Sequence, residues 1–285
     1  MIPSIPSSRL FQLTYRFYVV AFFIYLLLPL TIVILFSFND SLFPSLPWKG
    51  FTLDWYLGTR EPRLGIFHDS ELLESVWTSV VVAAATTVLS VVVSLCNAFL
   101  FEREEFAGKN LLYLMMLVPL VIPGVILGVS ILIFGSSLAN HIEAWWGFDI
   151  EGLRPGLPLV VLGQFAFITT ICTLVISARL RKFDQSLEEA ALNLGASRWT
   201  AIRTITLPYL RPALVGAAIV SFLMSFENFN TTLMLVGSDA PLTIAMFDRL
   251  REGSTPVINA VSTLLMLFSG ALAMASVFVQ RPARG

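Results

Sequence analysis

Few residues of this chain have the types and spacing that catalysis or metal binding requires. The sequence holds two histidines and two cysteines, and it contains no CxxC, HExxH or clustered His/Cys pattern, so no metal site is expected. Cys96 and Cys172 lie inside long apolar runs, and we interpret both as small buried hydrophobic side chains. No GxxxxGKS or GxxxxGKT phosphate-binding loop occurs, so any ATP must bind to another chain.

The segment 182–208 carries the most specific arrangement of polar and small residues. Ser186 and Glu189 have the spacing of an S-x-x-E capping box, which predicts that a helix begins there. Gly195 is suited to ending that helix, because glycine readily adopts the left-handed conformation found after helix C-termini. Ser197 can cap a second short helix. We therefore predict a helix, a turn and a second helix; the alternative is an ordinary amphipathic surface loop.

Glu227 is the one acidic residue well inside an apolar run long enough to span a membrane, and Asn228 and Asn230 lie beside it. Charge at membrane depth is costly, so by default it marks a pathway or a binding partner. We interpret these three residues as the surface of a path for a cationic or hydrogen-bonding substrate. The alternatives are a helix end near the outer interface and a structural hydrogen bond. Asn97 and Gln164 are better explained as hydrogen bonds between helices.

Composition identifies the elements that must hold these residues. Hydrophobic residues make up 56% of the 285-residue chain and charged residues 13%, with a mean hydropathy of +0.80, whereas soluble proteins average about 25% charged residues. A spanning helix needs about 20 apolar residues. Six runs qualify: 17–38, 76–101, 111–134, 157–178, 212–236 and 257–279. We predict an all-α integral membrane protein with a single transmembrane domain over residues 1–285.

Three further features refine this picture. The first run follows two arginines, but it is too long for a signal-peptide core and lacks an A-x-A-like cleavage site, so we predict an uncleaved first span. The third run contains Pro119 and Pro123, which indicate a kinked helix facing other helices. The second and fifth runs are rich in small and hydroxylic residues, which permit close helix packing.

The distribution of charge predicts how the spans are oriented. With six spans, both termini share one side with the loops between spans two and three and spans four and five. That side holds twelve Lys and Arg residues, against six on the other. The positive-inside rule then places both termini in the cytoplasm. The outer loops carry twelve acidic residues, and we expect the long loop 39–75 to cap the outer face. The net charge of −1 gives no indication of a nucleic-acid partner.

The segment 182–208 also resembles a known family motif. Glu189-Ala190-Ala191, Gly195 and Ile205-x-Leu207-Pro208 match the defining positions of the EAA loop of ABC importer permeases. The resemblance covers most of the chain and implies the type I (MetI-like) permease fold, in which this loop forms a cytoplasmic coupling helix that docks on an ATPase subunit. On that resemblance, ATPase coupling is assigned to Glu188, Glu189, Ala190, Ala191, Leu194, Gly195 and Ala196.

Within that superfamily, the chain resembles the second permease of polyamine (spermidine/putrescine) importers. Three segments carry this likeness: Phe51-Thr-Leu-Asp-Trp-Tyr56, Leu117-Val-Pro-Leu-Val-Ile-Pro-Gly124 and Ser225-Phe226-Glu227-Asn228. Asn228 stands where related permeases often carry an acid. Permeases for opines, amino-acid derivatives, iron or thiamine therefore remain alternatives.

The resemblance also implies partners and a location. It implies ATP-binding subunits, expected to be two, a second permease subunit, a periplasmic or extracellular substrate-binding protein, and membrane lipid. Whether the permeases pair as a homodimer or a heterodimer stays open. The location implied is the bacterial cytoplasmic (inner) membrane. The chain itself would not be an enzyme and would hold no cofactor, because the partner ATPase binds ATP and Mg²⁺.

Two other classes of membrane protein fit the sequence less well than an importer permease does. A secondary transporter or channel acting alone predicts inverted repeats or broken helices in matching positions, and the sequence shows no such pair. A membrane-embedded enzyme predicts a cluster of intramembrane acids, histidines or serines, for which the single Glu227 is poor support.

Overall fold

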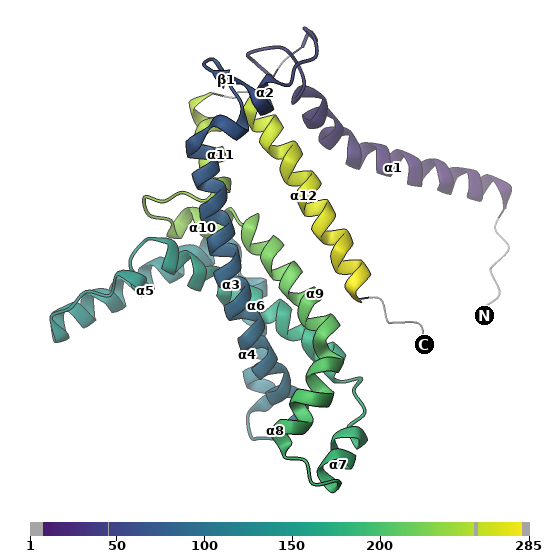
Figure 1. The fold of residues 1–285 in the computed structure, drawn as a ribbon, viewed down its shortest axis with the longest axis vertical. Helices are drawn as coiled ribbons and strands as arrows, with labels where there is room; N and C mark the ends of the chain where they lie inside the picture. Colours follow the sequence, from purple (N-terminus) through teal and green to yellow (C-terminus); the bar gives the residue numbers. More distant parts are fainter. Residues whose placement is uncertain (1–7, 45, 254–255, 281–285) are drawn as a thin grey trace. The chain divides into compact units, whose positions relative to one another are not determined.

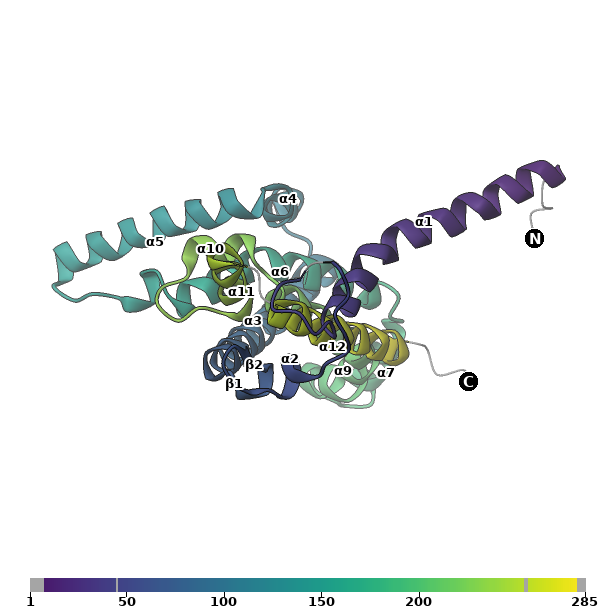
Figure 2. The ribbon, with the colours of Figure 1, turned by 90° about the horizontal axis from the view of Figure 1, so that it is seen from above.

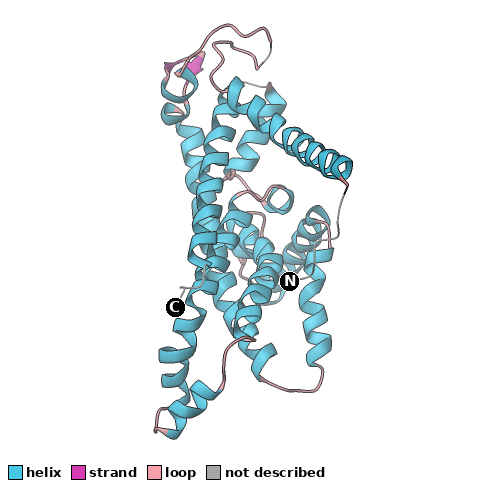
Figure 3. Cartoon of the chain, turned by 90° about the vertical axis from the view of Figure 1, so that its right-hand side faces the viewer, coloured by secondary structure: helices cyan, strands magenta, loops and turns pink. Residues whose placement is uncertain are grey.

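The computed structural model describes residues 8–44, 46–253 and 256–280, and its regular structure is almost entirely helical (Figure 1 and Figure 3). Within these residues, six helical stretches are long and apolar enough to span a membrane. They are α1 (Arg9–Phe36), α3 (Ser70–Arg103), α5 (Gly124–Trp146), α6 (Leu157–Leu180), the stretch from α8 into α9 (Arg198–Phe226) and α12 (Pro256–Gln280). The prediction of an all-α chain with six spans is confirmed.

The chain forms two compact units, which are described separately. The first comprises the described residues up to Ser70 together with Arg249–Leu267. The second comprises Glu71–Asp248 together with the described residues from Phe268 onward. This division reflects contacts between residues and does not test whether the chain is one functional domain. The single permease domain over residues 1–285 therefore stays a prediction.

The loop that follows α1 in the first unit is folded rather than irregular. It contains α2 (Asp54–Leu57), the antiparallel strands β1 (Thr59–Arg60) and β2 (Arg63–Leu64), and the 3₁₀ turn η1 (Ile66–His68). Trp55 is 1% exposed, and its indole N–H donates to the backbone oxygen of Asn39 at 2.8 Å. The Tyr56 hydroxyl donates to Ser37 Oγ, also at 2.8 Å. These buried aromatic side chains hold the loop against the end of α1.

Ion pairs complete the packing of this loop. Arg63 contacts Asp40 at 2.6 Å and Asp54 at 2.9 Å, and the hydrogen bond from Arg63 lowers the pKa of Asp54. The buried Asp69 accepts hydrogen bonds from both terminal guanidinium nitrogens of Arg249, at 2.5 and 3.0 Å. These bonds attach the loop to the end of α11 (Leu242–Glu252). Three acids of this loop thus have arginine partners, Asp40 and Asp54 with Arg63 in the loop itself and Asp69 with Arg249 of α11.

The third apolar run is two helices and not the single kinked helix predicted over 111–134. α4 (Lys109–Val121) ends before Pro123, and α5 begins at Gly124. Pro123 has no backbone N–H and disfavours the helical conformation for the residue before it. Ile122 accordingly has extended backbone, with φ −77° and ψ 128°. α5 then continues to Trp146, well beyond the predicted end of this span.

The fifth apolar run is also broken, where a single span over 212–236 was predicted. α9 (Leu207–Phe226) ends before Glu227, and α10 (Asn230–Leu235) begins after three non-helical residues. The prediction of one continuous span over 212–236 and of no pair of broken spans is therefore wrong.

The two broken runs pack against each other in the second unit. α10 lies against α5, and α5 extends from α4 past α10 (Figure 2). Glycines permit this approach: a Cβ atom on Gly128 would lie 2.9 Å from the Cβ of Met234, and one on Gly163 of α6 would lie 2.3 Å from Leu235 Cδ1. The close packing that small residues allow in lipid is therefore realised at this contact.

α6 lies at the centre of the second unit and packs on α9, α10, α5 and α4. Its buried residues include Ile168, Cys172 and Ile176, which share a cluster with Ala98 of α3 and Leu210 of α9. The predicted burial of Cys172 is confirmed. The same prediction for Cys96 is wrong, because Cys96 lies on an exposed face of α3.

Candidate functional site

The segment after α6 forms the predicted helix, turn and second helix. α7 (Ser186–Asn193) is followed by the short helix α8 (Arg198–Ala201) and a π-helical turn, η3 (Ile202–Thr206), that leads into α9. Figure 1 shows α7 and α8 at the end of the second unit that lies farthest from α10. The structure therefore presents these elements at one extremity of this unit.

The start of α7 differs from the predicted capping box. Ser186 is the first helical residue, and its backbone N–H donates to Asp184 Oδ1 at 3.0 Å. Hydrogen bonds from the Ser186 side chain and backbone lower the pKa of Asp184. A carboxylate at the start of a helix is also stabilised by the positive end of the helix dipole. The interpretation of Ser186 and Glu189 as a capping box is wrong, because Asp184 satisfies the first turn instead.

The predicted end of α7 and the cap of α8 are confirmed. Gly195 has φ +91°, its N–H donates to the Leu192 oxygen at 2.9 Å, and the Ala196 N–H donates to the Ala191 oxygen at 3.0 Å. These two bonds form a Schellman motif, which satisfies carbonyls left free at the helix end. Ser197 Oγ accepts from the Thr200 N–H at 3.1 Å.

The conformation of Gly195 gives a direct test of this turn. A Cβ at Gly195 would meet no atom within 4 Å, so substitution acts through the positive φ alone. Gly195→Ala should destabilise the turn by roughly 1 kcal/mol and lower ATP-driven transport about fivefold. Gly195→Asn should destabilise the turn less, because asparagine adopts a positive φ more readily than alanine. Gly108→Ala, at another positive φ of +87°, is the matched control. Equal losses for the alanine and asparagine variants at residue 195 would contradict this explanation.

The seven residues predicted to couple to an ATPase do not share one environment. Glu189, Ala190, Leu194 and Gly195 are exposed, and Ala191 and Ala196 are half-buried. Glu188 differs from its neighbour Glu189, because its Oε1 lies 3.4 Å from Arg103 Nη2 of α3 and accepts a hydrogen bond from the Thr206 hydroxyl. The sequence did not distinguish these two adjacent carboxylates.

Exposed apolar side chains surround this segment. Leu187 is 51% exposed, Leu194 is 89% exposed and Trp199 is 66% exposed. Only Leu194 was singled out from the sequence. Large apolar side chains left in contact with solvent on an exposed turn are typical of a surface that contacts another protein. The pattern that could have identified Leu187 and Trp199 is a large apolar side chain at the start of each short helix, next to charged residues.

The break in the fifth span holds the three residues predicted to line a substrate path. Glu227 caps the end of α9, is exposed, and accepts a hydrogen bond from the Ser269 hydroxyl of α12. Asn230 is also exposed and begins α10. Asn228 Oδ1 accepts from the Thr232 N–H at 3.2 Å and from the Thr232 hydroxyl at 3.0 Å. The oxygen of Asn228 therefore stabilises the start of α10, which leaves Glu227 as the charged group at the break.

Gln164 of α6 joins the two helices on either side of this break. It is 1% exposed, its Nε2 donates to Thr232 Oγ1 at 2.9 Å, and its Oε1 accepts from the Ser225 hydroxyl. Asn97 Nδ2 lies 3.5 Å from Thr173 Oγ1. Both residues form hydrogen bonds between helices, as predicted.

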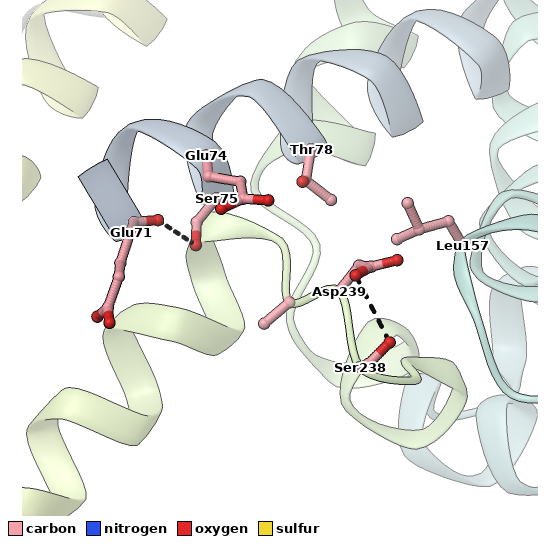
Figure 4. A pocket seen from close by; sticks show the side chains of 8 residues that line it. Glu71, Glu74, Ser75, Thr78, Leu157, Ser238 and Asp239 are labelled. Carbon is pink, nitrogen blue, oxygen red and sulfur yellow. Dashed lines mark hydrogen bonds between the residues drawn. The ribbon is translucent and has the colours of Figure 1, made fainter.

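A pocket of about 460 Å³ lies at the other end of α3 (Figure 4). Glu71 and Glu74 from the first turns of α3 and Asp239 from the loop after α10 line it, together with the hydroxyl-bearing residues Ser75 and Thr78. Glu71, Glu74 and Asp239 are among the twelve acidic residues of the predicted outer loops, but nothing in the sequence indicated that they lie together. Among the described residues, no three His, Cys, Asp or Glu side chains are arranged to hold a metal ion. The pocket is suited to attracting a cation through charge and hydrogen bonds.

Comparisons with known proteins agree with this arrangement. The family described as "Binding-protein-dependent transport system inner membrane component" matches residues 98–282, a range that includes α7, α8 and the break after α9. The putrescine transport system permease protein PotI of Escherichia coli (strain K12) is 31% identical over 246 residues, covering 86% of this chain and 82% of PotI. The spermidine/putrescine transport system permease protein PotC of Haemophilus influenzae is 30% identical over 258 residues, covering 90% and 92%.

The fold also has solved counterparts. A chain of a bacterial ABC transporter involved in the import of the acidic polysaccharide alginate aligns with a TM-score of 0.68 over 95% of this chain and 97% of that one. At 17% sequence identity this likeness concerns the fold alone. Together with the family match, it identifies the chain as a member of the binding-protein-dependent transport system inner membrane components, a multi-pass, MetI-like permease of an ABC importer.

Proposed function

We propose that this permease forms, with a second permease subunit, the path of a polyamine-like cation into the cell. The observation that carries this proposal is the likeness to PotI and PotC over most of the chain, since both are named as putrescine or spermidine/putrescine permeases. The acidic pocket at Glu71, Glu74 and Asp239 supports it, because carboxylates raise the local concentration of a cation. Glu227, at the break of the fifth span, supplies a second carboxylate position for such a cation.

ATP is hydrolysed, on this proposal, by separate subunits that dock on α7 and α8. A substrate-binding protein delivers the cation to the outer face, and both chain termini lie in the cytoplasm. The exposed Glu189, Ala190 and Leu194 on α7 and the turn after it support the docking part of the proposal. The excess of Lys and Arg on the side that holds α7 supports the orientation.

The test of the substrate is uptake by the complete complex, reconstituted in proteoliposomes with its ATPase and substrate-binding protein. Labelled putrescine and spermidine should accumulate only when ATP is supplied on the side of α7. Unlabelled diamines should compete, and sulfate or a neutral sugar should not. The initial rate should fall as ionic strength rises, because salt screens an acidic entry surface. ATP-dependent uptake of another solute, without polyamine uptake, would overturn the substrate class and leave the importer function intact.

Orientation predicts a clear labelling pattern. Exposed positions Glu61 and Gln185 lie on opposite sides if the twelve-to-six distribution of Lys and Arg sets the topology. In a background with both native cysteines replaced by serine, Glu61→Cys should react with an impermeant maleimide in intact spheroplasts. Gln185→Cys should react only after permeabilisation. The reverse pattern would overturn the cytoplasmic assignment of α7.

A further inference from the structure

Glu188 is distinguished from the rest of α7 by the direction of its side chain. Its side chain is 21% exposed, whereas the neighbouring Glu189 is exposed. The side chains of adjacent helix residues point about 100° apart, so Glu189 can contact a docking partner while Glu188 contacts the membrane-spanning helices. The two carboxylates can therefore have different functions.

Two contacts from different elements meet at one oxygen of Glu188. Arg103 Nη2, at the end of α3, lies 3.4 Å from Oε1, and the Arg103 side chain is 14% exposed. The hydroxyl of Thr206, a fully buried residue at the end of η3, donates to the same Oε1. A single carboxylate thus joins α7, α3 and η3. We call Glu188, Arg103 and Thr206 the Glu188 clasp.

Arg103 is itself held in position by aromatic packing. Its guanidinium carbon lies 5.4 Å from the centre of the Phe183 ring, and Phe183 packs edge-to-face on Tyr209 of α9 at 5.1 Å. A guanidinium over an aromatic face is favourable and keeps a preferred orientation. The arginine of the clasp is therefore fixed relative to both α3 and α9.

α7 packs on α8 and η3, whereas its contacts with α3 and α9 are few. None of its residues is buried, and a cavity of about 430 Å³ is lined by residues of α7, α3 and α8, among them Arg103, Glu188, Arg198 and Ala201. A helix without buried apolar side chains gains little from packing. Polar contacts such as the clasp consequently account for a large part of its attachment.

We propose that Glu188 is a positioning residue that transmits movement of α7 to the membrane-spanning helices. The inference rests on the proposed docking of an ATPase at α7. α3 runs without a break from the acidic pocket at Glu71 to Arg103, about 50 Å at 1.5 Å per residue. Thr206 adjoins α9, which ends before Glu227. The clasp therefore connects α7 to the outer pocket through one rigid helix and to the break in the fifth span through another.

The test compares carboxylate variants in the assembled complex, with ATP hydrolysis and uptake measured together. Glu188→Gln keeps the shape and an acceptor for Thr206 but removes the charge that attracts Arg103. The ATPase subunit should stay bound and hydrolyse ATP, while solute transported per ATP hydrolysed should fall about fivefold, the lower range of coupling between sites. Thr206→Val should act in the same direction. Glu105→Gln is the matched control, because this carboxylate is 89% exposed and pairs with Lys109 only four residues away.

A charge exchange separates transmission from simple stability. Arg103→Glu alone should lower the transport ratio, and combining it with Glu188→Arg should restore part of it, because the ion pair is reformed and the Thr206 hydroxyl can accept a hydrogen bond. Restored assembly of the double variant without a restored ratio would overturn the proposal, as would an unchanged ratio in Glu188→Gln. A wild-type complex that binds no ATPase subunit would instead refute the proposed function, so the two failures are distinguishable.

Discussion

Ala190→Trp should abolish ATP-driven uptake, while the permease should still insert into the membrane. Ala190 is exposed on α7, beside Glu189 and away from the cavity behind the helix. A small residue on a docking surface allows close approach of the partner, and an indole there forces the surfaces apart. A contact of this kind is worth ~2 kcal/mol or more, so affinity for the ATPase subunit should fall by at least about 30-fold. Co-purification of the subunit and ATP-dependent uptake measure this directly.

The matched control places the same indole elsewhere on the same side. Ala107 is exposed in the loop between α3 and α4, and Ala107→Trp should leave assembly and uptake near wild type. Ala190→Ser, which keeps the small volume, should also transport. Normal uptake by Ala190→Trp would show that α7 does not enter a groove on a partner, and it would remove the main support for the docking proposal.

Hydropathy predicted the spans but not where two of them break. Both broken runs are apolar on average, so the mean hydropathy over about 20 residues does not reveal an interruption of a few residues, even where Glu227 and Asn228 lie at it. The break at Ile122 and Pro123 has a local cause in the missing N–H of proline, and the sequence pattern indicated a kink there. The break after Phe226 combines a local contact, from Thr232 to Asn228, with a distant one, because Gln164 bridges Ser225 and Thr232 from a different helix.

The candidate site was predictable to the extent that it is local in sequence. Gly195 and Ser197 take the predicted roles because capping involves residues within one turn. The cap of α7 was misassigned because Asp184, two residues before Ser186, accepts the hydrogen bond of the Ser186 N–H group. The inward turn of Glu188 and the meeting of Glu71 with Asp239 depend on where α3 lies. Contacts of that kind arise from tertiary packing, which spacing along one segment does not encode.

Glu227→Gln tests the other end of the transport path, and we expect a large loss of uptake. The carboxylate lies at the C-terminal end of α9, so its charge and the negative end of the helix dipole both attract a cation to this position. A contact between a cation and a carboxylate is worth about 4 kcal/mol at an effective dielectric constant of 20, before the cost of removing water is subtracted. We therefore expect uptake of a polyamine to fall about tenfold or more, with assembly and basal ATP hydrolysis retained.

The competing explanation for Glu227 is structural, and Ser269 separates the two. The Ser269 hydroxyl donates a hydrogen bond to Glu227, so Ser269→Ala removes this bond and keeps the charge of Glu227. If the charge serves the substrate, Ser269→Ala should transport nearly as well as wild type, and Glu227→Gln should be deficient specifically in uptake. If the contact with α12 is what matters, both variants should lose assembly or thermal stability to a similar degree. Unchanged polyamine uptake in Glu227→Gln would exclude this carboxylate from the path, because an amide cannot replace the attraction of a negative charge for a cation.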